Sequence, residues 1–123
     1  MDMLGRTVFL CALAVAVPSA AGEPLVMRLT PAVALEPAQL TIRASIEADS
    51  DNRALEIVAE STDFYRSSEI SLDGESAPRL NVFEFKNLPT GTYYVTGVLI
   101  GSRGHRAVVS RVFRVEPAGG STR

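Results

Sequence analysis

Few side chains in this sequence of 123 residues could carry out catalysis. His105 is the only histidine, and the sequence contains no G-x-S-x-G motif, the turn that exposes the serine of many hydrolases. A catalytic triad needs a histidine beside an activated serine and a carboxylate, and no residues near His105 indicate that arrangement. We therefore expect His105 to be a solvated loop residue in a chain that is not an enzyme.

Metal-ligating residues are equally scarce. A zinc site needs several histidines or cysteines, and the sequence has His105 and one cysteine, Cys11. Oxygen donors of the kind that bind calcium gather in the segment EADSDN: Glu47, Asp49, Asp51 and Asn52. Arg53 stands at a ligand position of an EF-hand loop, and the glycine of that loop is missing. We interpret the segment as a solvated acidic loop, with calcium binding left open, and we expect no metal and no cofactor.

The first 22 residues have the layout of a secretory signal peptide. Arg6 precedes an apolar run from Val8 to Val17, and small residues end the segment at Ala21 and Gly22. The run is about ten residues long, whereas a transmembrane helix needs about 20. We expect cleavage after Ala21 or Gly22, export to the periplasm, the cell surface or the medium, and no stable membrane insertion afterwards.

The rest of the sequence predicts one β-domain over residues 23–116 and a flexible tail over residues 117–123. Apolar and polar residues alternate with the period of a half-buried strand, most clearly in LTIRASIE (40–47). Short strands of this kind, separated by turn signals, are typical of β-sandwiches and barrels. The formal net charge is −2, without the basic excess of nucleic-acid-binding domains, so we expect no nucleic-acid partner.

Two details of the strand pattern are specific enough to test. Asp73-Gly74 is the favoured dipeptide of a tight hairpin turn, which predicts that the strands on either side pair with each other. Leu80 and Val82 are out of phase with Phe83 and Phe85, which predicts a bulge near Asn81 or Val82. The segment PAVALEP (31–37) is interpreted as a proline-bounded link.

The segment FKNLPTGTYYV, residues 85–95, predicts a corner between two strands. Its key residues are Leu88, Pro89, Gly91 and Tyr93. Pro89 cannot donate a backbone hydrogen bond, and a buried Tyr93 can return its hydroxyl to the backbone upstream. The segment resembles the corner of bacterial immunoglobulin-like and fibronectin type III-like domains, and also that of carboxypeptidase regulatory-like domains. This resemblance implies an all-β, seven-stranded antiparallel immunoglobulin-like β-sandwich.

The same resemblance implies two candidate surfaces. In such a sandwich the acidic loop and the hairpin loop before the last strand lie at one end, which gives a candidate loop-end site. Its residues are Asp49, Asp51, Arg103, His105 and Arg106. The outward face of the strand near residues 92–101 and of its neighbours gives a candidate interface. Its residues are Val58, Tyr94, Val98, Ile100, Val108 and Val112.

Together these expectations indicate an exported, non-catalytic binding or scaffolding domain. Its expected partner is a protein, either another exported protein or a second copy of the chain, and a small-molecule ligand is not expected. One alternative is an accessory, polysaccharide-binding module, although the sequence has no tryptophan and 3 tyrosines for stacking on sugars. Another is a secreted inhibitor or chaperone-like domain that acts by strand addition.

Overall fold

The computed structural model describes residues 23–119, so the expected signal peptide and residues 120–123 lie outside the described part of the chain. The strands are β1 (Leu25–Thr30), β2 (Val33–Leu35), β3 (Ala38–Ile46), β4 (Ala54–Glu60), β5 (Tyr65–Ser71), β6 (Leu80–Leu88), β7 (Gly91–Gly101) and β8 (Gly104–Glu116). A short 3₁₀-helix, η3 (Gly74–Ser76), lies between β5 and β6. In this part of the chain, no helix has the length and apolar character needed to cross a membrane.

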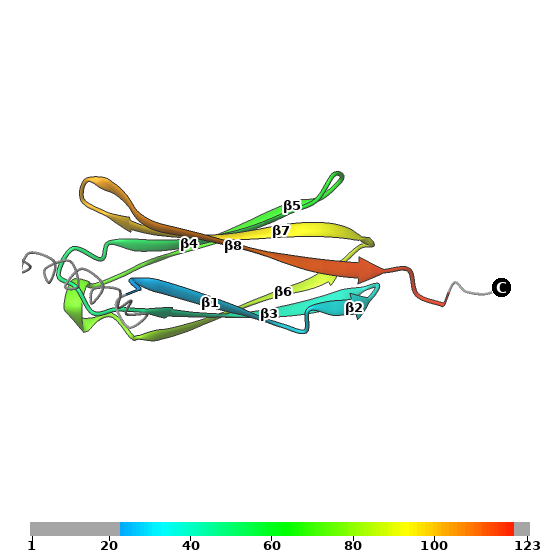
Figure 1. The fold of residues 1–123 in the computed structure, drawn as a ribbon, viewed down its shortest axis with the longest axis horizontal. Coiled ribbons are helices and arrows are strands. Elements are labelled where there is room, and N and C mark those ends of the chain that lie inside the picture. The colour runs from blue at the N-terminus through cyan, green and yellow to red at the C-terminus, as the bar shows by residue number, and fades with distance from the viewer. Residues whose placement is uncertain (1–22, 120–123) are drawn as a thin grey trace, which may run out of the picture.

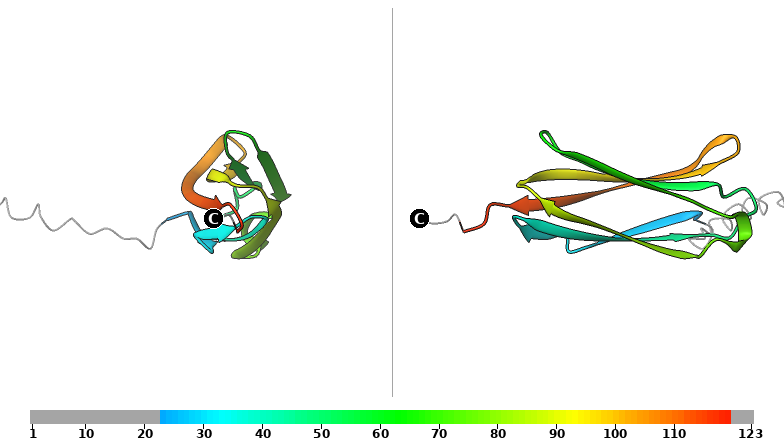
Figure 2. Two further views of the ribbon diagram at one scale, coloured as in Figure 1. Left: turned by 90° about the vertical axis from the view of Figure 1, so that its right-hand side faces the viewer. Right: turned by 180° about the vertical axis from the view of Figure 1, so that it is seen from behind.

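The strands form two sheets that pack face to face (Figure 1). One sheet has three strands in the order β1-β3-β6, and the other has five in the order β2-β8-β7-β4-β5. Neighbouring strands are antiparallel except β2 and β8, which are parallel. Seen end-on, the two sheets are curved layers around a shared core (Figure 2). The prediction of an all-β domain is confirmed at the level of two packed sheets.

The core consists of the inward positions of both sheets. On β3, Leu40, Ile42 and Ala44 are fully buried, as the alternation in LTIRASIE predicts. Leu55 and Ile57 of β4 face them from the other sheet and are also fully buried. Burying one such aliphatic side chain stabilises the folded state by about 1.5–3 kcal/mol, so a core of this size supports the domain without disulfide bonds.

The proline-bounded link contains a strand that the sequence analysis missed. β2 is only three residues long, too short to show alternation, and it pairs in parallel with the end of β8 through Val33 and Arg114. The chain therefore leaves the three-stranded sheet after β1, joins the five-stranded sheet at β2, and returns at β3. This crossing ties the two sheets together and brings the strand count to eight rather than the expected seven.

The Asp73-Gly74 prediction was wrong, because β5 and β6 belong to different sheets and do not pair. The chain at this point forms η3 instead, with Gly74 at φ 56° in the left-handed region that favours glycine. Two backbone bonds hold the segment against the loop between β3 and β4: Gly74 N–H donates to Asn52 O at 3.1 Å, and Leu72 N–H donates to Arg53 O at 2.8 Å. Asp73-Gly74 thus begins a crossing between sheets.

The expected bulge near Asn81 or Val82 is also absent. Val82 pairs in regular register with Arg43, and both Leu80 and Val82 lie half exposed on the outer face of the three-stranded sheet. The register instead shifts at the other end of this pair, between Ala38 and Leu40, opposite a segment in which Asn87 has a positive φ of 60°. The phase change in β6 therefore reflects exposed apolar residues on the outer face and not an extra residue.

Candidate functional site

The turn between β6 and β7 is fixed by Tyr93. Its side chain is fully buried, and its hydroxyl donates to the Pro89 carbonyl oxygen at 2.7 Å. The ring lies edge-on to Phe64, with ring centroids 6.0 Å apart, and against Phe113 at 6.1 Å. Burial raises the pKa of Tyr93, which keeps the hydroxyl protonated and able to donate. Leu88, fully buried, packs in the core beside this turn.

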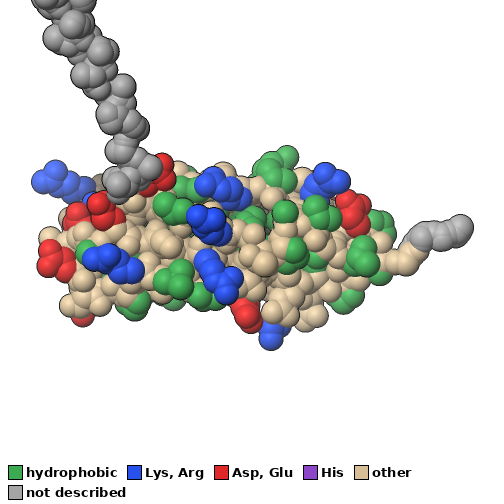
Figure 3. Space-filling model, turned by 60° about the horizontal axis from the view of Figure 1, so that its bottom comes forward, with side chains coloured by type: hydrophobic (Ala, Val, Ile, Leu, Met, Phe, Trp, Pro, Cys, Tyr) green, Lys and Arg blue, Asp and Glu red, His purple; other side chains and the backbone are tan. Residues whose placement is uncertain are grey.

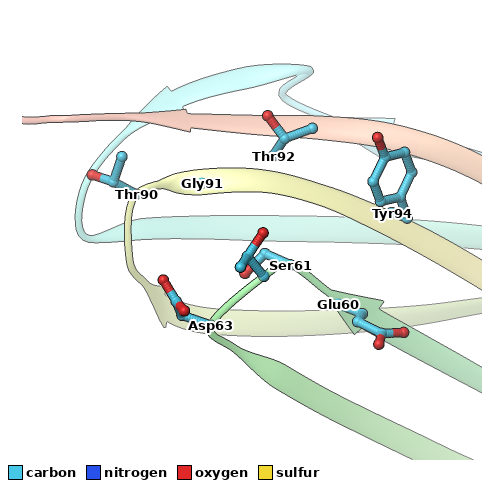
Figure 4. Close-up of a pocket in the computed structure, with 8 residues that line it drawn as sticks. Glu60, Ser61, Asp63, Thr90, Gly91, Thr92 and Tyr94 are labelled. Atoms are coloured by element: carbon cyan, nitrogen blue, oxygen red, sulfur yellow. The ribbon is translucent and has the colours of Figure 1, made fainter.

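A cleft of about 600 Å³ opens beside this corner (Figure 4). It lies between the turn that joins β4 to β5 and the start of β7, which face each other across it. Its lining residues are Glu60, Ser61, Thr62, Asp63, Thr90, Gly91, Thr92 and Tyr94. The lining thus has two carboxylates, several hydroxyls and one aromatic ring, and it has no lysine or arginine.

Backbone and side-chain hydrogen bonds shape both walls of the cleft. Ser61 N–H donates to Phe64 O at 2.8 Å, which closes the β4–β5 turn around Thr62 and Asp63. On the opposite wall, Thr90 N–H donates to the Glu36 carboxylate at 2.8 Å, and the Thr90 hydroxyl donates to the same oxygen. These bonds lower the pKa of Glu36, so its carboxylate is ionised at neutral pH next to the cleft.

The rim of the cleft continues onto the outer face of the five-stranded sheet. Tyr94 stands directly opposite Glu60 in the β4–β7 register, and its side chain is 58% exposed. Among residues 23–119, neither Glu60 nor Asp63 takes part in an ion pair. The nearby Arg114, opposite Thr92 in register, is bound to Glu116 at 3.0 Å. The cleft is therefore an acidic, oxygen-lined site with an aromatic edge.

Of the residues that line this cleft, the sequence analysis singled out only Gly91, as part of the corner motif, and Tyr94, as part of the candidate interface. Ser61, Thr62 and Asp63 have the composition of an ordinary polar turn, which is what they form. Their relation to Thr90 depends on β4 and β7 being neighbours in the sheet, which no local pattern indicates. The sequence analysis did expect the strand of Val58 to lie beside residues 92–101, but it gave no indication that the ends of these strands enclose a cleft.

The candidate loop-end residues lie at the opposite end of the molecule, where the β3–β4 loop meets the β7–β8 hairpin (Figure 1). Arg106 donates to Asp49 Oδ2 at 3.0 Å and to Asn52 Oδ1 at 2.5 Å. Asp51 accepts from Ser102 N–H at 3.1 Å. The Ser102 side chain, and after it this backbone bond, lower the pKa of Asp51. The structure thus joins the two loops through a closed set of contacts, with the carboxylates turned toward Arg106.

The other members of the loop-end set are placed differently. Arg103 and His105 are exposed in the hairpin, and the described residues give neither of them an ion pair. Asn52, one of the expected calcium donors, is fully buried, and its amide donates to Glu47 O at 3.0 Å. Its oxygen is occupied by Arg106, so Asn52 is part of the link between loops.

The candidate interface residues share the outer face of the five-stranded sheet. Tyr94 stands opposite Val112, and Val98 stands opposite Val108, in the β7–β8 register. Tyr94, Val108 and Val112 are each more than half exposed, whereas Val98 is only 8% exposed because its neighbours cover it. Val58 and Ile100 are half-buried on the same face. An interface at this face remains a prediction from the sequence.

Comparison with known proteins gives a fold and no family. No protein-family model matches the chain, and no curated protein matches its sequence. Among solved structures, superoxide reductase (neelaredoxin) from Ignicoccus hospitalis matches with a TM-score of 0.57 at 12% identity, over 76% of this chain and 81% of that one. A variant of the same protein matches with a TM-score of 0.55 at 12% identity, over 74% and 80%.

These matches correct the family assignment made from the corner. The chain resembles superoxide reductases in fold, so the assignment to immunoglobulin-like, fibronectin type III-like or carboxypeptidase regulatory-like domains was wrong. The assignment was wrong because the motif is short. Residues 85–95 specify one turn and one buried tyrosine, and they do not determine the order of the other strands.

The expected function, a non-catalytic binding or scaffolding domain, was also wrong, because it was inferred from that family assignment. A non-catalytic binding or scaffolding domain, an accessory polysaccharide-binding module and an inhibitor acting by strand addition were all inferred from the immunoglobulin-like class. The structures that match are enzymes, which contradicts the expectation of a chain without catalysis. At 12% identity the likeness concerns the fold alone, and the reduction of superoxide is an activity of those neighbours.

The residues of this chain do not fit a redox-active metal centre of the usual kind. The facial triad of non-haem iron uses two histidines and a carboxylate, and blue-copper sites use two histidines and a cysteine. This sequence has only one histidine, His105, and one cysteine, Cys11. Over residues 23–119, no group of three or more histidine, cysteine, aspartate or glutamate side chains is placed to hold a metal ion.

Proposed function

We propose that the chain binds a small organic cation, a compound with an ammonium group, in the acidic cleft between the β4–β5 turn and the start of β7. The observation that carries this proposal is the lining of the cleft: Glu60 and Asp63 without a basic side chain, and Tyr94 at the rim. An ammonium group donates charge-assisted hydrogen bonds to carboxylates and is attracted to the face of an aromatic ring.

The charge around the cleft favours a cation over other small ligands. The ionised Glu36 adds a negative charge behind Thr90, and the neighbouring Arg114 is already paired with Glu116. An anion would be repelled by these carboxylates, and a neutral ligand would gain nothing from their charge. For the same reasons the proposal does not extend to superoxide, which is an anion. The sequence also has only one histidine, His105, and one cysteine, Cys11, too few for a metal centre of the kinds described above.

The volume also suits a ligand of modest size. Pockets for small molecules in proteins run from about 300 to 1,000 Å³, and this cleft of about 600 Å³ lies within that range. Its walls come from two turns, one held by the backbone bond from Ser61 to Phe64 and the other by the bond from Thr90 N–H to the Glu36 carboxylate, so the site is formed without the ligand. A preformed site loses less conformational freedom when it binds.

The direct test is titration calorimetry with choline, using its uncharged carbon isostere as the matched ligand control. We expect choline to bind and the isostere to bind at least about tenfold more weakly, because the difference is the ammonium charge. The double variant Glu60→Gln/Asp63→Asn should lose about tenfold in affinity, at about 1 kcal/mol or less for each exposed charge.

A variant with the same change in net charge outside the cleft completes this experiment. Glu69→Gln/Glu84→Gln removes two exposed carboxylates from other parts of the sheets and should bind choline as the wild type does. Equal affinity for choline and its isostere, or equal losses in the two double variants, would contradict the proposal.

The proposed location of this activity is outside the cytoplasm, after removal of the first 22 residues. The support is the sequence pattern around Arg6, the apolar run and Gly22. N-terminal sequencing of the protein from its native host should give Gly22 or Glu23 as the first residue. Recovery of the chain with Met1 intact from the cytoplasm would contradict export.

A further inference from the structure

A row of arginines crosses the boundary between the two sheets. Arg28 of β1 stands directly opposite Arg43 of β3, and both point outward from the three-stranded sheet. Arg111 of β8 lines the same groove as Arg28. Figure 3 shows a run of basic side chains across the middle of this face. The protein has a formal net charge of −2, so this concentration of positive charge is local.

The arginines in this row have no acidic partner among residues 23–119. No ion pair includes Arg28, Arg43 or Arg111, and the one hydrogen bond of an Arg111 guanidinium goes to the carbonyl of its neighbour Ser110 at 2.9 Å. The carboxylate closest to Arg43 in the strand register is that of Glu84, which pairs with Thr41, two residues along β3 from Arg43. Like charges directly opposite on neighbouring strands destabilise a sheet, so the Arg28–Arg43 pair is a cost to the folded state.

The position of Arg111 adds to this cost. It pairs with the fully buried Val95, so its place in the alternation of β8 is on the core side of the strand. Phe113 and Val115, the next residues with the same phase, are apolar and buried. Arg111 stays exposed because this part of β8 lies beside β1, where the two sheets meet at a groove.

The groove between β1 and β8 has an apolar floor. Its volume is about 480 Å³, and its lining consists of the two arginines and the apolar residues Val26, Met27, Leu29, Ala32 and Val112. Val112 is 52% exposed. A ligand that complements this surface needs an anionic head for Arg28 and Arg111 and an apolar part for the floor. The volume is in the range of pockets that hold one small molecule.

From this arrangement we infer a second binding site, for a single-chain anionic amphiphile such as an alkyl phosphate or carboxylate. Its head lies between the guanidinium groups of Arg28 and Arg111, which form paired hydrogen bonds with phosphate and carboxylate oxygens. Its alkyl chain lies along the apolar floor of the groove. The anion offsets the repulsion within the arginine row. This site is separate from the acidic cleft and does not depend on the function proposed for it.

The test uses monomeric octyl phosphate as the probe, with binding followed by titration calorimetry. We expect one site, at least about tenfold weaker binding of inorganic phosphate, which lacks the tail, and no binding of octyl glucoside, which lacks the charge. The double variant Arg28→Gln/Arg111→Gln should lose at least about tenfold in affinity for octyl phosphate. The control variant Arg103→Gln removes a positive charge from the exposed β7–β8 hairpin and should bind as the wild type does.

Thermal unfolding of the same variants separates binding from a structural role. Because the arginines repel one another, the midpoint of Arg28→Gln/Arg111→Gln should equal or exceed that of the wild type without ligand. A lower midpoint together with unchanged affinity would overturn the inference. So would a wild type that fails to bind octyl phosphate, or that associates with phosphatidylglycerol vesicles but not with the monomeric amphiphile.

Discussion

At the scale of single residues, the described part of the chain uses its polar side chains in two ways. Tyr93 and Asn52 are fully buried, and each satisfies its polar atoms inside the protein, at the Pro89 carbonyl and at Arg106 and Glu47. Glu60 and Asp63, in contrast, face an open cleft with no basic partner. Buried polar groups that are paired stabilise a fold, whereas unpaired charges in a concave site are available to a ligand.

The buried hydroxyl of Tyr93 can be tested against its exposed neighbour. Tyr93→Phe keeps the ring packing and leaves the Pro89 carbonyl oxygen without its donor, so we expect a loss of about 1–3 kcal/mol in the free energy of unfolding. Tyr94→Phe, on the outer face, should change it by less than about 0.5 kcal/mol. Urea denaturation of both variants gives the comparison, and equal losses would show that the hydrogen bond does not hold the corner.

At the scale of elements, the β7–β8 hairpin is joined to the β3–β4 loop by side-chain contacts. The two strands pair along their whole length, and the hairpin reaches the β3–β4 loop through Arg106 and Asp51. Gly101, the last residue of β7, lies directly under these contacts. A Cβ atom at this position would collide with Asp51 Oδ2 and lie 2.7 Å from Arg106 Cδ.

Gly101→Ala should therefore separate the two loops. Because the added methyl group displaces Asp51 and Arg106 together, we expect a loss of about 1–3 kcal/mol in the free energy of unfolding. Arg103→Ala, two residues further along, changes an exposed side chain of the same loop that has no ion pair among the described residues, so it serves as the control. Chemical denaturation measures both, and a fully stable Gly101→Ala would mean that the loops are not packed as described.

At the scale of the whole molecule, the sequence predicted features that depend on neighbouring residues. It did not predict features that depend on contacts between distant parts of the chain. Alternation identified β3 and its buried residues Leu40, Ile42 and Ala44 because strand faces follow from local spacing. The sheet crossing at Gly74 could not be found in this way, because Asp-Gly looks the same in a hairpin and in a crossing. The same limit applied to the family: one corner was taken to represent the topology of all the strands.

The candidate sites show this limit most clearly. The acidic cleft brings together residues 60–63 and 90–94, and the arginine row brings together Arg28, Arg43 and Arg111. Each depends on which strands are neighbours, and that order is set by long-range pairing. The loop-end charges were grouped from the resemblance, which puts both loops at one end of a sandwich. In the structure Arg106 contacts Asp49 and Asp51, and a binding site at this end stays a prediction. The contact of Arg106 with the buried Asn52 was visible only in the structure.

The central claim is that the acidic cleft binds an organic cation, and nuclear magnetic resonance with choline tests it most directly. Titration into the labelled protein should shift the amide signals of residues 60–63 and 90–94, on the two walls of the cleft. Signals of residues 101–106, in the loop that joins β7 to β8 at the opposite end of the molecule, should stay unchanged. The carbon isostere of choline should leave the cleft signals in place. Shifts confined to other surfaces, or none up to saturating choline, would contradict the account.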